Sequence, residues 1–215
     1  MSKSTALPTA TREQLWATWL WRLLIAVASG VALYLMFSDD FTPGGVLDQI
    51  LYFTTLSTLM VFLVSVGYVL RPLFLHGTPR SRIEGNLPWL RGIATCMTVF
   101  TGIIFFFLLG GEYPDLSGKL AHVACPIMMA VDWLFVGRNQ GRLRAWVPLT
   151  WLAVLVPYLF AYSWDAHRDG APMYPFLNPL EPGFLKWCAI MIAAFAVLTY
   201  VVWALGRLRG RILTK

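Results

Sequence analysis

The sequence predicts an all-α fold, a single bundle of six transmembrane helices that takes in residues 1–215. Of the 215 residues, 58% are hydrophobic and 13% are charged, whereas soluble proteins carry about 25% charged residues. The mean hydropathy is +0.63. Six apolar segments reach the length of roughly 20 residues that a helix needs to cross a bilayer. Ten Trp and eight Tyr suit the aromatic belts at the two membrane surfaces.

The fourth of these apolar segments is the shortest, and it contains Pro126 and Asp132. Between the last two, prolines exclude a regular helix over most of residues 164–183. The Met, Tyr, Phe and Leu side chains there are too apolar for a solvated linker, so we expect this segment to cap the outer mouth of the bundle. The predicted spans are residues 15–37, 47–70, 90–110, 120–136, 146–163 and 184–205.

Basic residues concentrate in alternate loops. The first loop and the start of the second span contain Asp39, Asp40 and Asp48 and no basic residue, whereas four arginines lie in or beside the second loop. The fourth loop and the C-terminal tail are basic as well. Because cytoplasmic loops carry the excess of Lys and Arg, we expect both termini in the cytoplasm.

Several classes of partner and cofactor are disfavoured. The net charge of +6 is spread over alternate loops rather than one patch, so no nucleic-acid partner is expected. The three cysteines lie in apolar segments and form no CxxC pair, so no disulfide framework is predicted. Asp165, His167 and Asp169 alternate in the predicted cap, but nothing else completes a metal site. No metal or other cofactor is expected.

Hydroxyl groups share one face of the second predicted span. Thr54, Ser57, Thr58 and Ser65 are offset by 3, 4 and 11 residues, which places them on one side of a helix. That side should face the bundle interior, about two turns below the outer end, towards His122. The simpler interpretation is that each hydroxyl bonds to a carbonyl one turn earlier.

His122 is the only histidine in an apolar segment. An ionisable side chain within the membrane is a functional candidate by default, and imidazole suits proton transfer at neutral pH. Against this, His122 lies near an interface, where water reaches it easily. We expect His122 to act as a base for a Thr54 nucleophile in the outer half of the membrane. Cys125 shares the His122 face and is the rival nucleophile, although buried cysteines are usually inert.

Two charged residues are expected in the inner half of the bundle. Arg22 and Asp132 lie near the cytoplasmic ends of the first and fourth spans, and buried ionisable groups are usually paired. We predict an ion pair, with Arg22 reaching up to the headgroups as the alternative. The third span carries a polar stripe that should also face inward: Arg91, Thr95, Thr98 and Thr101.

Three short elements resemble the androgen-induced and androgen-dependent integral membrane protein family. They are Phe53-Thr54-Thr55-Leu56-Ser57, His122 followed by Pro126, and Met173-Tyr174-Pro175-Phe176-Leu177 followed by Pro182-Gly183. Members of the family are six-helix membrane hydrolases of fatty-acid esters of hydroxy fatty acids, with an intramembrane threonine nucleophile and histidine. The resemblance implies these roles for Thr54 and His122.

The chain also departs from the animal members of that family. Its spacing from His122 to Pro126 is one residue shorter, a second histidine upstream is absent, and Ser57 stands where some members have an acid. The Asp132-Trp133 pair looks more like the bacterial branch, which implies a bacterial plasma membrane protein. These differences bear on the substrate more than on the fold.

The function expected from the sequence is hydrolysis of a lipid ester within the bilayer. The partner is then a lipid with acyl chains, and Ser57, Thr58 or Tyr174 would stabilise the oxyanion. Cys125 and Met129 are further candidates for contact with the substrate. The alternative is a non-catalytic membrane protein that binds or transports a lipid or small solute, or regulates a partner.

Overall fold

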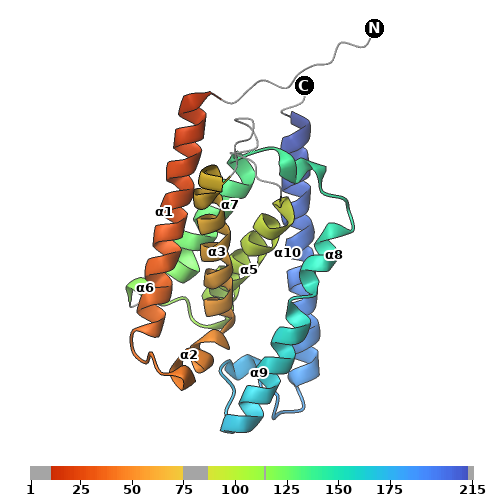
Figure 1. The fold of residues 1–215 in the computed structure, drawn as a ribbon. Helices are drawn as coiled ribbons and strands as arrows, with labels where there is room; N and C mark the ends of the chain where they lie inside the picture. Colours follow the sequence, from red (N-terminus) through yellow and green to blue (C-terminus); the bar gives the residue numbers. More distant parts are fainter. Residues whose placement is uncertain (1–10, 75–86, 114, 213–215) are drawn as a thin grey trace.

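The computed structural model describes residues 11–74, 87–113 and 115–212, and this part of the chain is all helical (Figure 1). Five helical stretches within it are long and apolar enough to cross a membrane. This bears out the prediction of an all-α protein with membrane-spanning helices. The five are α1 (Arg12–Phe37), α3 (Phe53–Phe74), α5 (Pro88–Leu108), the pair α8 (Val147–Leu152) and α9 (Leu155–Asp169), and α10 (Phe184–Ile212).

The fourth predicted span, residues 120–136, is not one continuous α-helix. The chain there forms α6 (Leu116–Lys119), a π-helical turn η1 (Leu120–Ala124) and α7 (Cys125–Phe135). Pro126 explains the break, because a proline inside a helix donates no hydrogen bond and its ring clashes with the carbonyl four residues earlier. The segment packs against α1, α3 and α5, but it is not among the five candidate spans.

Two predicted boundaries are wrong. The second span starts at Phe53 rather than Leu47, because a separate short helix, α2 (Pro43–Ile50), precedes it. Thr54 therefore lies in the first turn of α3 and not two turns inside. The predicted cap also starts too early, since α9 continues to Asp169 and ends at Gly170 with a positive φ of 70°.

The cap is thus residues 170–183, with one turn of 3₁₀-helix, η3 (Pro175–Leu177). Asp165, His167 and Asp169 belong to α9, where Arg168 pairs with Asp165 and Asp169 at 2.8 and 2.7 Å. The two ends of the described chain lie at one end of the bundle, and α2 and α9 lie at the other (Figure 1).

Helix α5 forms the centre of the bundle, and a larger share of it is buried than of any other candidate span. It packs against α3, α7 and α10. The polar stripe predicted to face inward does so, since all four of its side chains are buried: Arg91, Thr95, Thr98 and Thr101.

Asp132 of α7 lies between two buried arginines at the end of the bundle that holds the termini. Arg22 Nε lies 3.3 Å from Asp132 Oδ1, which is the ion pair expected from the sequence, and Arg91 Nη1 lies 3.4 Å from Asp132 Oδ2. The Arg91 guanidinium also donates to Gln140 at 2.6 Å, and Arg22 stacks over the Tyr68 ring at 3.9 Å. This charged cluster ties α1, α5 and α7 together.

The cluster makes Asp132→Asn a strong test of the packing. The change keeps the side-chain volume but leaves two buried arginines without their carboxylate, and breaking a buried ion pair typically costs about 3–5 kcal/mol. We expect a clearly lower unfolding midpoint in detergent micelles. Asp48→Asn is the control, because Asp48 meets Arg168 at the exposed surface and should change stability little. Equally small shifts of the unfolding midpoint in both variants would show that the charged cluster does not hold the helices together.

Candidate active site

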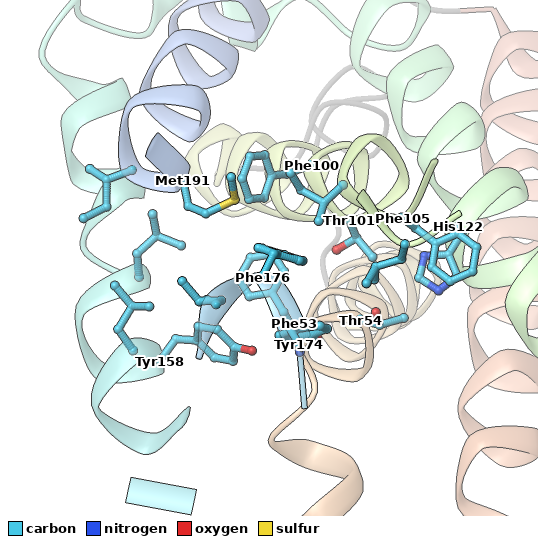
Figure 2. A pocket seen from close by; sticks show the side chains of 16 residues that line it. Phe53, Thr54, Phe100, Thr101, Phe105, His122, Tyr158, Tyr174, Phe176 and Met191 are labelled. Carbon is cyan, nitrogen blue, oxygen red and sulfur yellow. Dashed lines mark hydrogen bonds between the residues drawn. The ribbon is translucent and has the colours of Figure 1, made fainter. Parts of the chain in front are cut away.

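A cavity of about 60 Å³ opens at the end of the bundle opposite the termini. Its walls come from α3, α5, η1, α9, the cap and α10, and they are almost entirely apolar. Figure 2 shows the side chains that point into it. Its polar lining consists of Thr54, Thr101, His122, Tyr158 and Tyr174.

His122 is positioned by the π-helical turn. The Cys125 amide donates to the Leu120 carbonyl, five residues earlier, and Pro126 leaves the His122 carbonyl without its usual helical donor. That carbonyl faces Gly102 of α5, where an added Cβ would lie 2.8 Å from the oxygen. Gly102 therefore permits a close approach of η1 to α5. π-turns occur frequently at functional sites.

The His122 imidazole has one face covered and one nitrogen available. Phe105 stacks on the ring at 3.8 Å between centroids and 20° between planes, and the Thr101 carbonyl interacts with the ring edge. The Nδ1 atom is buried and accepts no hydrogen bond from the described residues. A neutral imidazole nitrogen without a hydrogen-bond partner can accept a proton.

Asp115 adds a negative charge near this ring. It caps α6, where it accepts hydrogen bonds from the Gly118 amide and the Ser117 hydroxyl. These two donors lower the pKa of the Asp115 carboxyl below its usual value, so the group stays ionised at neutral pH.

Thr54, on the first turn of α3, lines the same cavity as His122, and both lie on the side of it away from Tyr158 (Figure 2). Its hydroxyl lies near that of Tyr174. Unlike the hydroxyls of Ser57 and Thr58, it donates to no backbone carbonyl of the described residues. Thr54 and His122 form no direct hydrogen bond in the described chain. A water molecule or a small side-chain movement would be needed to connect them.

Of the five other candidate substrate contacts, one lines the cavity. Ser57 and Thr58 donate their hydroxyls to the Thr54 carbonyl at 2.9 and 2.8 Å, so their protons are already used within the helix. Cys125 and Met129 are 0% and 2% exposed and lie outside the cavity lining. Tyr174 lines it, and its hydroxyl accepts a hydrogen bond from the Phe53 amide at 3.1 Å.

Sequence reasoning missed several residues of the site. Nothing in the sequence marked Tyr158 as a site residue, because tyrosines in apolar spans are common in the aromatic belts at the membrane surfaces. Gly102 and Phe105 were part of an ordinary apolar helix. Pro126 four residues after His122 was the usable signal for the π-turn, since it identifies the carbonyl that loses its donor.

Gly102→Ala tests how closely η1 must approach α5. The added methyl would collide with the His122 carbonyl and with Pro126, 2.8 and 3.2 Å away, and overpacking of this kind typically costs about 1–3 kcal/mol. We expect a lower unfolding midpoint in detergent. Gly67→Ala is the matched control, because its methyl would meet nothing within 4 Å and alanine favours a helix. A Gly102→Ala protein as stable as the control would refute this close contact.

Comparison with known proteins does not assign the chain to a family. It matches no protein-family model, no curated protein and no solved structure.

Proposed function

We propose that the protein hydrolyses an ester of a lipid within the membrane, with Thr54 as nucleophile and His122 as base. One observation carries the proposal. A threonine and a histidine from separate segments line one apolar cavity, and the histidine presents a buried nitrogen without a hydrogen-bond partner among the described residues. The short motifs that resemble a family of membrane ester hydrolases support the same roles.

The reaction would proceed through an acyl-enzyme. His122 Nδ1 takes the Thr54 proton, directly or through one water, as Thr54 Oγ1 attacks the ester carbonyl. The tetrahedral intermediate collapses, and the leaving alcohol takes the proton from His122. Water then attacks the acyl-threonine while His122 accepts its proton, and that proton returns to Thr54 Oγ1 as the acid departs.

The lining favours an acyl chain over a polar substrate. Phe100, Ile104, Leu159 and Met191 form apolar walls, and Ile192, which is 40% exposed, lies at the outer surface. A volume of about 60 Å³ holds an ester group and a short length of chain. The remaining methylene groups would extend past Ile192 into the surrounding lipid. A substrate that enters the cavity from the side of the bundle keeps its acyl chain in the lipid and out of water.

The proposal includes a topology. The segment that carries η1 would be the sixth crossing, with both termini in the cytoplasm, in the plasma membrane of a bacterium. The termini lie at one end of the bundle (Figure 1), as an even number of crossings requires, and the basic loops favour the cytoplasm for that end. The cavity would then lie in the outer half of the membrane.

A transport function would need a polar path from the cavity to the Arg22–Asp132 cluster. On α1, α3, α5 and α7, one fully buried apolar side chain lies between these two regions along the chain, and the four pack together: Ile25, Val61, Ala94 and Met129. Thr95 and Thr98 are buried in the same interval of α5, but neither lines the cavity. This packing favours a pocket closed at its inner end, as hydrolysis requires, over a conduit.

Replacement of either member of the pair should abolish ester turnover. We expect Thr54→Ala and His122→Ala to lose at least about a thousandfold in kcat for 4-nitrophenyl octanoate in micelles, since either loss removes the nucleophilic unit, with unfolding midpoints close to that of the unmodified protein. Thr95→Ala and His167→Ala are matched controls outside the cavity and should stay active. Near-normal turnover by Thr54→Ala or His122→Ala would rule out the pair.

A fluorophosphonate probe distinguishes the two possible nucleophiles. The unmodified protein should be labelled, and the label should disappear in Thr54→Ala because its target oxygen is gone. Cys125→Ala should keep the label, since Cys125 is fully buried outside the cavity. Labelling that survives in Thr54→Ala and is lost in Cys125→Ala would move the nucleophile to Cys125.

A further inference from the structure

The hydroxyl of Tyr158 is an unused hydrogen-bond donor inside the cavity. Tyr158 is 7% exposed, and its side chain points into the cavity from α9 (Figure 2). The hydroxyl lies close to that of Tyr174, but it completes no hydrogen bond of normal geometry with the described residues. A buried hydroxyl without a hydrogen-bond partner lowers the free energy of unfolding by about 1–3 kcal/mol. A ligand that accepts a hydrogen bond from this hydroxyl would remove that cost.

Tyr174 holds the neighbouring position and is itself fixed in place. Its oxygen accepts the Phe53 amide at 3.1 Å, and its backbone is fixed by Tyr162, whose hydroxyl donates to the Leu177 carbonyl at 2.6 Å. The rings of Tyr158 and Tyr162 stack at 6.1 Å, and those of Tyr162 and Tyr174 at 5.7 Å. The cap and α9 therefore hold both hydroxyls rigidly beside Thr54.

We propose that Tyr158 is the oxyanion donor of this site, and that its O–H binds the carbonyl oxygen of the ester that Thr54 attacks. This inference rests on the proposed hydrolase function and adds the group that stabilises the transition state. Thr54, Tyr174 and Tyr158 form a row of hydroxyls at the cavity wall, with Tyr174 between the other two. Tyr158 and His122 lie on opposite sides of Thr54 (Figure 2), so an ester whose carbonyl carbon met Thr54 Oγ1 could direct its oxygen towards Tyr158 and away from His122.

The assignment also agrees with the chemistry of the other polar groups. Ser57 and Thr58 donate to the Thr54 carbonyl, and Thr101 donates to the Met97 carbonyl or to Ser57, so their protons are spent. A preorganised donor in an apolar, water-poor site stabilises developing negative charge more strongly than one in water. The oxygen of the ester gains its full charge only after Thr54 attacks, so the bond strengthens in the transition state.

Tyr158→Phe is the direct test, because it removes the hydroxyl and keeps the ring that packs on Phe53. With 4-nitrophenyl octanoate in micelles, we expect kcat to fall by about 10²–10³, the usual effect of one oxyanion donor, and KM to change less than about threefold. Affinity for an octyl trifluoromethyl ketone, which forms a tetrahedral adduct with the nucleophile, should fall in parallel with kcat. The unfolding midpoint should stay close to that of the unmodified protein.

Tyr200→Phe is the matched control, since Tyr200 is partly exposed on α10 and lies outside the cavity. It should leave kcat, KM and ketone affinity unchanged. A Tyr158→Phe protein with kcat within about twofold of the unmodified value, while Thr54→Ala is inactive, would overturn the role of Tyr158 and leave the hydrolase proposal standing. Absence of ester turnover in the unmodified protein would overturn both.

Discussion

The site depends on one steric constraint, the clash between Pro126 and the carbonyl of His122. A proline within a helix cannot donate to the residue four positions earlier, and its ring excludes that carbonyl from its normal place. The chain responds with a π-turn over Leu120–Ala124, which places the freed carbonyl against Gly102. The same turn directs the imidazole onto Phe105 and into the cavity. A regular α-helix would present His122 in another direction, because a π-turn changes the register of every side chain before it.

The second determinant of the site is the contact of the cap with the start of α3. Helix α3 begins at Phe53, where the first amides of a helix have no carbonyl partner within it. The Tyr174 hydroxyl takes the first of these amides and so holds the cap over Thr54. Tyrosine rings from α9 stack behind it. The nucleophile candidate, the cap and α9 are thereby joined in one packed unit, although Thr54 lies more than a hundred residues before the other two along the chain.

Two sets of buried polar groups lie at opposite ends of the bundle, the charged cluster around Asp132 and the polar groups of the cavity. At the end with the termini, Asp132 is held between Arg22 and Arg91 by ion pairs, which tie α1, α5 and α7 together. In the cavity, His122 Nδ1 and the Tyr158 hydroxyl are buried without partners among the described residues. Unsatisfied groups cost stability, and a ligand bound in the cavity would complete these two.

The coarse features of this protein followed from its sequence, and the finer ones did not. Hydropathy predicted the all-α membrane fold, and the rarity of charge in apolar segments led to the Arg22–Asp132 contact. The hydroxyl face of the second span and the lone intramembrane histidine led to two residues that line one cavity, whose catalytic roles remain predictions. Hydropathy did not show that α3 begins at Phe53, because residues 47–70 read as one mainly apolar segment and the turn at Leu51–Tyr52 has no Gly or Pro. Tyr158 could not be predicted as a site residue, because its position in the cavity depends on how α9 and the cap pack against the start of α3.

An experimental structure of the protein with a non-hydrolysable lipid-ester analogue in the cavity tests the central claim most directly. The account predicts that the analogue's carbonyl carbon lies against Thr54 Oγ1, with His122 Nδ1 within hydrogen-bond reach of that oxygen, directly or through one water. An ester group bound elsewhere, or Thr54 and His122 turned towards separate lipid-facing surfaces with packed side chains between them, would contradict it.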